Sequence, residues 1–521
     1  MRECALPLLR EAAVRKFFAE RHDFYVYDAK SLIHFFRPHK ISFTSAFDLL
    51  LAAYVAEPFS HDFSYRAIAA RELGVTAGDL GGLLGHFFAA ADALGQKLEQ
   101  GELRFIFEKI EIPLSTILAE MEERGVAIDR GFLRKLGKMV SKKIEDTTGE
   151  IYALSGEEFN INSSQQLSQI LFEKLGLKPY GLRKTEKGGV VSTRESELEK
   201  LRSEHPIVAK VLDYRELAKL KSTYIEALPA LVDEKTGRLH TTFNQTGTAT
   251  GRLSSLNPNL QNIPIMSEIG REIRKAFVAK SGFVLASFDY SQIELRVAAH
   301  LANDRKMIEA FKRGLDIHKM TAAEIYNVPL EQVTPELRRA AKTLNFGVLY
   351  GMGPQAFAES TGVAREQAKK FIDEYFSDFS GVRDYIERTK EFAAQNGYVE
   401  TLYGRRRWIP ETHSPNWRIR REAERMAVNT PIQGTATGDI IKLAMIAVDK
   451  WIKKEKLEED IQMLLQVHDE LIFEIKESAV KKAAPIIRKI MEEAVELKVP
   501  LEVDVKVGKN WGEQQPAAGS E

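Results

Sequence analysis

The chain has 521 residues, of which 44% are hydrophobic and 28% are charged, which is enough apolar material for several domains with separate cores. Lysine plus arginine and aspartate plus glutamate number 74 each, so the overall charge excludes a globally basic nucleic-acid-binding protein. The single cysteine, Cys4, excludes an internal disulfide, no apolar run reaches the length of a membrane span, and the first residues lack a signal-peptide pattern. The composition predicts a soluble protein of the cytoplasm.

The first two regions of the chain differ in their predicted secondary structure. Residues 1–105 are predicted to be mixed α/β, with a strand over Phe24–Lys30 and an apolar helix over Phe47–Pro58. Residues 106–236 are predicted to be mainly helical, and Phe159–Leu167 contains an Asn/Ser start signal before a helix.

Strands resume near Leu239–Asn244, and a chemically informative segment follows at Phe283–Arg296, FVLASFDYSQIELR. It begins apolar and β-prone, reaches Asp289, and then changes to a helical pattern. An aspartate at the end of a buried strand is a common position for a metal ligand. We therefore treat Asp289 as a candidate ligand.

A basic helix is predicted over Pro335–Tyr350. Four side chains, Arg338, Lys342, Phe346 and Tyr350, follow one another at steps of four, so they form one slanted stripe. Two cations followed by two aromatic rings can hold a polyphosphate at one end and stack a base at the other. A solvated helix face with a hydrophobic end is the alternative interpretation.

Basic residues are also concentrated between Thr401 and Arg425, a segment that contains seven arginines and only three glutamates. Such a patch can contact phosphates although the whole molecule is neutral.

The segment Gln462–Ile475, QMLLQVHDELIFEI, carries the adjacent acids Asp469 and Glu470 at its midpoint. A single strand would place Asp469 on the buried face, and a hairpin with the acids at its turn fits the pattern equally well. Together with Asp289, which lies 180 residues upstream, Asp469 could hold two Mg²⁺ about 3.5–4 Å apart for phosphoryl transfer.

Four segments in order resemble the signature segments of family A (polymerase I-like) DNA polymerases. They are TATGRLSSLNPNLQNIP (Thr248–Pro264), DYSQIELR (Asp289–Arg296), RRAAKTLNFGVLYG (Arg338–Gly351) and QVHDE (Gln466–Glu470). The resemblance extends from about Leu103 to Trp511 and is greatest to bacterial large fragments without working proofreading. It implies a template-directed DNA polymerase that adds deoxynucleotides to a primer 3′-hydroxyl and releases pyrophosphate.

The resemblance implies an α/β (α+β) right-hand fold with an antiparallel palm sheet, helical fingers and thumb, and a truncated RNase H-like exonuclease-type domain at the N-terminus. The implied domains are 1–105 (degenerate 3′–5′ exonuclease), 106–236 (thumb), 237–300 (palm), 301–438 (fingers) and 439–521 (palm). The implied partners are a primer-template duplex and dNTPs, and the expected protein is a cytoplasmic, nucleoid-associated monomer.

The resemblance also implies catalytic and nucleotide-binding roles. Two Mg²⁺, for which Mn²⁺ can substitute, would be held by Asp289, Asp469 and the carbonyl of Tyr290. Further catalytic residues would be Glu470 and Lys342. The nucleotide would contact Arg338, Lys342, Phe346, Tyr350, His318, Gln292 and Glu294, of which Glu294 would exclude a 2′-hydroxyl.

The DNA-binding residues implied by the resemblance fall into two groups. Arg252, Arg425, Asn429 and Gln433 would contact the terminal base pair from the minor groove, with His468 near the primer terminus. In the minor groove, purine N3 and pyrimidine O2 are hydrogen-bond acceptors in every correct base pair. Thumb contacts with duplex phosphates would come from Asn160, Asn162, Ser163, Lys221 and Thr223.

Two departures from the family pattern affect these expectations. The family usually reads Gln-Gly-Thr/Ser-Ala-Ala-Asp where this chain has QGTATGD (Gln433–Asp439), one residue longer. An extra residue rotates the downstream helix by about 100° unless a π-bulge or loop absorbs it. In addition, no Asp-x-Glu pair precedes Asp28, which resembles a second exonuclease motif as Asp92 resembles a third, so proofreading is predicted to be absent.

Two other classes of protein remain as alternatives. A two-metal nuclease or phosphatase could use the same aspartates but leaves the stripe of the basic helix unexplained. An inactive nucleic-acid-binding protein would bind primer-template DNA without extending it, although every expected acid is present.

Overall fold

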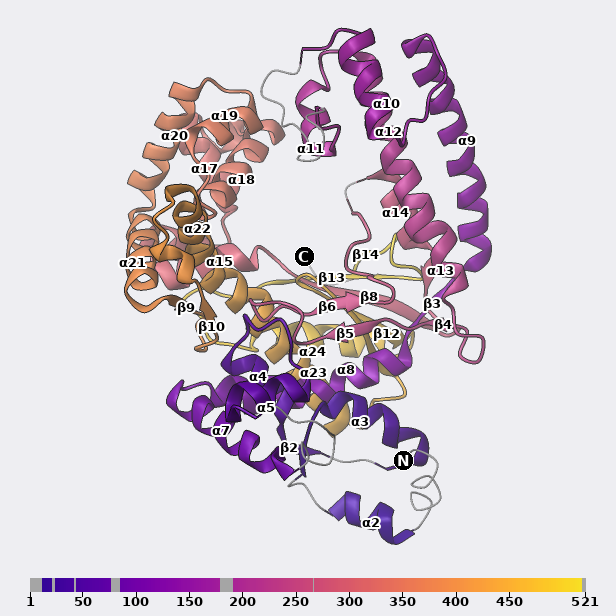
Figure 1. Cartoon of the computed structure of the whole chain (residues 1–521), viewed down its shortest axis with the longest axis vertical. Helices are drawn as coiled ribbons and strands as arrows, with labels where there is room; N and C mark the ends of the chain where they lie inside the picture. Colours follow the sequence, from indigo (N-terminus) through magenta and orange to yellow (C-terminus); the bar gives the residue numbers. More distant parts are fainter. Residues whose placement is uncertain are drawn as a thin grey trace.

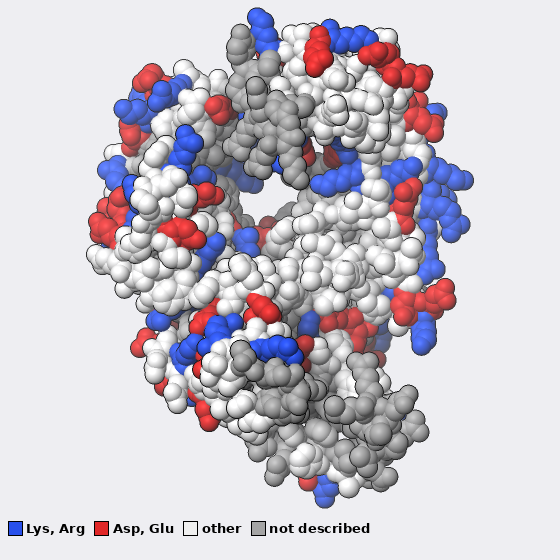
Figure 2. All heavy atoms as spheres, in the orientation of Figure 1, with Lys and Arg blue, Asp and Glu red and all other residues white. Residues whose placement is uncertain are grey.

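The computed structural model describes residues 12–20, 24–41, 44–75, 85–178, 191–265 and 267–517. Two helical arms rise from a central sheet on either side of an open space, and a further helical body lies beneath the sheet (Figure 1). The space remains open when all heavy atoms are drawn (Figure 2). The predicted α/β architecture, with an antiparallel sheet and two helical arms, is confirmed.

The central sheet has the strand order β11–β12–β8–β13–β14, and every neighbouring pair is antiparallel. Its strands are β8 (Phe283–Tyr290), β11 (Ile461–Val467), β12 (Glu470–Lys476), β13 (Val503–Gly508) and β14 (Gln515–Pro516). Strands β8 and β12 are buried along most of their length, which explains their nearly continuous apolar sequences.

Helices α8 (Ile112–Arg124), α23 (Ile441–Lys454) and α24 (Val480–Glu492) pack together beside this sheet. Helix α8 contacts β11, α24 contacts β13, and α23 contacts both helices. Smaller sheets join strands that lie between the larger elements: β3 (Val126–Ile128) with β4 (Arg238–Leu239) and β7 (Phe277–Val278), β5 (Thr242–Asn244) with β6 (Ser254–Leu256), and β9 (Tyr398–Glu400) with β10 (Arg406–Trp408).

Acidic residues Asp469 and Glu470 lie at the turn of a hairpin. Strands β11 and β12 pair antiparallel, with Val467 opposite Glu470. His468 takes a positive φ of 56° at the tip. The hairpin interpretation of Gln462–Ile475 is therefore correct, and the single-strand interpretation is wrong.

The body beneath the sheet has its own core, which includes Leu51, Tyr54, Ile68 and Leu94. Strands β1 and β2 pair in parallel. Its elements are α2 (Ala12–Glu20), β1 (Phe24–Val26), α3 (Ala29–Phe36), η2 (Arg37–His39), β2 (Ser45–Asp48), α4 (Leu49–Ala56), α5 (Tyr65–Leu73) and α7 (Phe87–Gln100).

Two predicted boundaries in this body are wrong, for the same physical reason. The strand predicted over Phe24–Lys30 ends at Val26, because Asp28 takes a left-handed conformation and its side chain caps α3. The helix predicted over Phe47–Pro58 begins at Leu49, because the Asp48 carboxylate accepts hydrogen bonds from the first backbone N–H groups of α4. An aspartate at each N-cap ends one element and starts the next.

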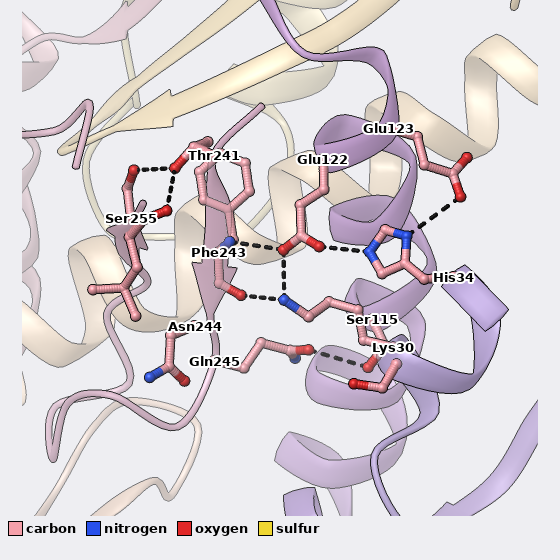
Figure 3. A network of polar contacts seen from close by, with 12 residues as sticks. Lys30, His34, Ser115, Glu122, Glu123, Thr241, Phe243, Asn244, Gln245 and Ser255 are labelled. Carbon is pink, nitrogen blue, oxygen red and sulfur yellow. Dashed lines mark hydrogen bonds and ion pairs between the residues drawn. The ribbon is translucent and has the colours of Figure 1, made fainter. Parts of the chain in front are cut away.

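Contacts of Glu122 on α8 join this body to the rest of the molecule (Figure 3). Its carboxylate accepts hydrogen bonds from Lys30 Nζ and from the backbone N–H of Phe243 on β5, and it lies 2.6 Å from His34 Nε2. Lys30 Nζ also donates to the carbonyl of Phe243. One buried carboxylate thus connects α3, α8 and β5.

One arm is built on α9 (Arg130–Ser155), which packs against α12 (Pro206–Leu220). Between these helices lies a small separate core that includes Ile151, Leu167 and Val211. The other elements of this arm and its base are α10 (Ser164–Ser168), η4 (Gln169–Lys174), α11 (Glu195–Leu198), η5 (Glu199–Leu201), η6 (Lys221–Glu226), α13 (Ala227–Ala230) and α14 (Glu268–Lys275). The segment η3 (Ile106–Glu111) precedes α8 and packs against α4, in the core of the body beneath the sheet.

The other arm carries the predicted basic helix, which the structure contains as α18 (Pro335–Leu349). Helix α18 packs against α17 (Ile317–Ile325) and α19 (Pro354–Thr361). The remaining elements of this region are α15 (Ile293–Ala302), α16 (Arg305–Lys312), η7 (Leu330–Gln332), α20 (Arg365–Asp378), α21 (Ser380–Asn396), η8 (Pro410–His413) and α22 (Trp417–Gln433).

The extra residue in the segment Gln433–Asp439 is absorbed without a break in the helix. Helix α22 continues directly into the π-helical segment η9 (Gly434–Ile440), and η9 continues into α23. The expectation that a π-bulge could absorb the insertion is confirmed. Among the described residues, no helix is long and apolar enough to cross a membrane.

Candidate active site

Two aspartates that are far apart in the sequence meet at the central sheet. In the register of β8, Asp289 lies opposite Glu470 on β12, and the backbone N–H of Tyr290 donates to the carbonyl of Asp469 at 3.2 Å. On the other side of β8, Asp289 lies opposite Asp504 of β13. Acidic residues from β12, from β13 and from the turn between β11 and β12 therefore lie next to Asp289 at the end of β8.

The electrostatics of this cluster favour a cation. Burial, followed by the charges of Asp469 and Glu470, raises the pKa of Asp289 to about 8. Burial also raises the pKa of Asp469. Within the described part of the chain, the buried Oδ1 atom of Asp289 has no hydrogen-bond partner. A buried carboxylate oxygen without a donor is costly unless a cation or proton satisfies it.

The donor set fits a hard divalent ion such as Mg²⁺, because the carboxylates of Asp289 and Asp469 and the carbonyl of Tyr290 all offer oxygen. No group of three or more His, Cys, Asp or Glu side chains in metal-binding proximity occurs among the residues that the structure describes. Two carboxylates leave most of the ion's coordination positions to substrate phosphates and water, as Mg²⁺ commonly requires.

A chain of hydrogen bonds near this site connects Glu294 with three residues from other segments. Glu294, in the first turn of α15, accepts a hydrogen bond from Arg252 Nη2 at 2.9 Å and another from the Tyr350 hydroxyl. Arg252 Nε donates to the Thr437 hydroxyl at 2.5 Å. Burial raises the pKa of Glu294, and the adjacent Arg252 opposes that effect. These contacts join the loop that carries Arg252, the end of the basic helix and η9.

The basic helix brings the predicted stripe to the edge of the open space. Arg338 Nε lies 2.7 Å from Asp316 Oδ2, and Lys342 is exposed. Farther along, Phe346 packs with its ring centroid 6.2 Å from that of Tyr350. Lys and Arg side chains also border the open space on both arms (Figure 2).

His318 differs from the other predicted nucleotide contacts because it is only 2% exposed. Its Nδ1 lies 2.8 Å from the amide nitrogen of Asn345, and its ring packs 5.7 Å from that of Phe346. Burial lowers its pKa to about 4, so the ring is neutral at pH 7. Any phosphate contact by His318 would therefore be a hydrogen bond and not a charge pair.

Arg425, Asn429 and Gln433 follow one another at steps of four on α22. Arg425 Nε donates to the carbonyl of Tyr350 at 3.0 Å. In the part of the chain that the structure describes, the buried Oδ1 of Asn429 has no hydrogen-bond partner, and the same holds for the Oε1 of Gln292. Gln292 has a left-handed backbone, with φ of 53°, at the start of α15.

The remaining predicted residues near the primer position lie on the acidic hairpin. His468 is exposed at its tip. Glu470 accepts a hydrogen bond from Trp511 Nε1 at 3.3 Å, and Arg274 Nη1 lies 3.9 Å from its carboxylate. Glu470 is thus held within the protein and does not face the open space freely.

The predicted thumb residues have local structural roles of their own. Asn162 Nδ2 donates to the Tyr214 hydroxyl, and the Ser163 hydroxyl caps α10. Asn160 accepts from the backbone N–H of Asn162. Lys221 and Thr223 lie in η6. Lys221 is 3.5 Å from Glu226 and lines a cavity beside α9, whereas Thr223 lines a second cavity beside α12.

Several residues of the site were not anticipated from the sequence. Asp504 lies in the alternating segment VDVKV, a pattern that predicts a strand with one polar face. Thr437 and Asp316 contact predicted residues, but only the fold brings Thr437 to Arg252, 185 residues away. No local pattern in the sequence identifies that contact.

Comparison with known proteins agrees with this geometry. A sequence model described as DNA polymerase family A matches residues 130–513. The thermostable DNA polymerase I of Thermus aquaticus is 46% identical over 468 residues, which cover 89% of this chain and 55% of that protein. DNA polymerase I of Pseudomonas aeruginosa is 47% identical over 423 residues, covering 81% of this chain and 46% of that protein.

The chain therefore spans about half the length of the curated relatives that it matches. A solved structure, described as the POL domain of Pol1 from M. smegmatis in complex with DNA primer-template and dNTP, has a TM-score of 0.88 and 39% identity. The alignment covers 96% of this chain and 88% of that one.

Proposed function

The chain belongs to DNA polymerase family A, and we propose that it adds deoxynucleotides to the 3′-hydroxyl of a DNA primer on a template strand, with release of pyrophosphate. The observation that carries the proposal is the meeting of Asp289 and Asp469 at the end of a buried strand, together with the hydrogen bond from Tyr350, at the end of the basic helix α18, to Glu294 in the helix that follows this strand. The alternative of a nuclease or phosphatase does not account for the stripe on that helix.

We further propose that Asp289, Asp469 and the carbonyl of Tyr290 would hold two divalent ions, with Mg²⁺ as the physiological ion and Mn²⁺ as a substitute. Such ions, when bound, lower the pKa of the primer hydroxyl and neutralise the leaving pyrophosphate. The protein's own residues would position the reactants. Arg338 and Lys342 would bind the triphosphate, and Phe346 and Tyr350 would pack on the sugar and base.

The division of the chain follows from the same proposal. The arm of residues 106–236 would be a thumb that holds the duplex, and residues 301–438 would be fingers that hold the nucleotide. Residues 237–300 and 439–521 would form the palm. We expect the protein to act as a cytoplasmic monomer on a primer-template duplex.

We also propose that residues 1–105 form a degenerate exonuclease-type domain without proofreading activity. The Asp28 carboxylate accepts a hydrogen bond from the backbone N–H of Ser31 and caps α3, and Asp92 is exposed on α7. These capping and surface roles account for both acids without a metal. A mismatched primer-template incubated with Mg²⁺ and no nucleotides should keep its full primer length, and shortening from the 3′ end would contradict this part of the proposal.

Primer extension tests the polymerase proposal. The Asp469→Ala variant should lose nucleotide addition while keeping primer-template binding, because the thumb contacts persist. A control is Asp460→Ala, which removes an ion pair with Lys476 at the opposite end of the same hairpin. Extension by Asp469→Ala at the wild-type rate would refute the assigned site. A wild-type protein that binds DNA without extending it would instead support the inactive binding protein.

A further inference from the structure

The π-helical segment η9 presses closely on the loop that ends in Arg252. A Cβ atom added to Gly438 would lie 2.6 Å from the carbonyl oxygen of Thr250, and one added to Gly434 would lie 2.6 Å from the Thr401 side chain. Both distances are too short for any side chain. The backbone of η9 is therefore in direct contact with the residues just before Arg252.

The Arg405 side chain also packs closely against this loop, at Gly251. Gly251 has φ of 83°, and a Cβ atom there would lie 2.5 Å from Arg405 Nε. Arg405 Nε in turn donates to Asp439 Oδ1 at 2.8 Å, and Asp439 is fully buried within η9. One segment, η9, thus contacts the loop directly and also holds the Arg405 guanidinium that packs against Gly251.

A third contact reaches Arg252 itself. The Thr437 hydroxyl accepts a hydrogen bond from Arg252 Nε at 2.5 Å and donates one to the carbonyl of Gln433 at 2.9 Å. Thr437 is only 6% exposed, so water competes little for these bonds. A single buried hydroxyl thus bonds to the Arg252 guanidinium and to the backbone of Gln433, and these are two of the four residues that are assigned to the terminal base pair.

The orientation of Arg252 follows from its two contacts. A guanidinium is planar and carries its donors in a fixed fork. Thr437 holds Nε and Glu294 holds Nη2, and within the described part of the chain no residue forms a hydrogen bond with Nη1. The plane of the group is thereby set, with Nη1 left to meet an acceptor on the DNA.

We propose that Thr437, in the π-helical segment where this chain has one residue more than the family pattern, is a positioning residue for Arg252. It orients the free donors of the Arg252 guanidinium toward the minor-groove acceptors of the primer-terminal base pair, and it thereby determines how strongly the enzyme prefers a matched primer end. The proposal rests on the polymerase function proposed above.

The test compares extension from matched and mismatched primer ends by three variants. Thr437→Val keeps the side-chain shape but removes the hydroxyl, and Thr437→Ser keeps the hydroxyl. The control is Thr430→Val on α22, because Thr430 is also buried and its hydroxyl also donates to the carbonyl four residues earlier. Thr437→Val should lower kcat/KM for the matched end about tenfold and for the mismatched end much less, while Thr437→Ser and Thr430→Val keep the wild-type ratio.

A modified primer separates positioning from a general loss of stability. A primer that ends in 3-deazaguanine lacks the minor-groove N3 acceptor. The wild-type enzyme should extend it about tenfold more slowly than the normal primer, whereas Thr437→Val should show little further loss, because the two changes remove the same interaction. If Thr437→Val does not fold, Thr437→Ala is measured in the same way.

Three results would overturn the proposal: an unchanged matched-to-mismatched ratio in Thr437→Val, an equal loss in Thr437→Ser, or independent effects of the variant and the modified primer. These results differ from failure of the polymerase function itself, in which the wild-type protein would not extend a matched primer at all.

Discussion

The contacts of Glu122 predict that its charge contributes strongly to holding the N-terminal body against α8 and β5 (Figure 3). The Glu122 side chain is 9% exposed, and its partners Lys30 and His34 are 16% and 33% exposed. Replacing Glu122 with Gln removes the negative charge while leaving an oxygen that can still accept from the N–H of Phe243. The perturbation therefore removes the charge interactions selectively.

The expected cost follows from the burial of each partner. Removing one member of a buried ion pair costs roughly 3–5 kcal/mol, because the other charge remains unpaired. Lys30 is nearly buried and should contribute most of this cost, whereas solvent screens the more exposed His34. We expect Glu122→Gln to lower the free energy of unfolding by about 3 kcal/mol.

The neighbouring Glu123 provides a matched control. It pairs with the same His34 at 3.4 Å and with Arg37 at 2.7 Å, but its side chain is 34% exposed. Glu123→Gln should therefore cost less than about 1 kcal/mol. Urea unfolding at neutral pH measures both variants, and limited proteolysis reports whether the N-terminal body is released first. Equal losses in the two variants would show that the burial of Glu122 does not determine its contribution.

Three further predictions concern single side chains. The hydrogen bond to Glu122 raises the pKa of His34. The contribution of protonated His34 to stability is therefore complete below the unfolded pKa of 6.5 and is lost as pH rises through the folded pKa. Urea unfolding at about pH 6 and about pH 8.5 should show a smaller pH dependence of stability in His34→Gln than in the wild type. Glu294→Ala should increase ribonucleotide incorporation relative to deoxyribonucleotide by opening space beneath the sugar, and an unchanged ratio of kcat/KM values would remove Glu294 from that role. Phe346→Tyr should increase dideoxynucleotide use about tenfold, because a phenolic hydroxyl supplies a hydrogen bond near the missing 3′-hydroxyl; competition between dATP and its dideoxy form measures it, and equal termination by both proteins would contradict it.

The elements of the candidate site that the sequence predicts and the structure contains are a single helix and a single strand. Steps of four residues bring Arg338, Lys342 and Phe346 onto one side of α18, with Tyr350 at its C-cap, since helix geometry converts spacing into adjacency. The apolar sequence of β8 likewise predicts a buried strand that ends near Asp289. In both cases the relevant interactions are local, so a single sequence is sufficient.

The parts that the sequence does not predict depend on contacts between distant segments. The hairpin at Asp469 and a straight strand share one apolar pattern, and only the antiparallel pairing of β11 with β12 distinguishes them. The two N-terminal boundaries differ from prediction because Asp28 and Asp48 act as helix caps. Their carboxylates satisfy backbone N–H groups that hydrophobic periodicity does not describe.

The consequence of the extra residue in η9 depends on contacts that only the three-dimensional structure shows. An extra residue in a helix would turn every later side chain away from its partner, and Asp439 would then lose Arg405. The π-helical turn absorbs the residue, so Asp439 keeps its contact with Arg405. The same turn places Thr437 against Arg252 and leaves Gly438 as the residue whose lack of a side chain permits close packing. The residue that departs from the family pattern is thus accommodated where η9, the Gly251 loop and Arg252 meet, and only the contacts between these distant segments could show its position.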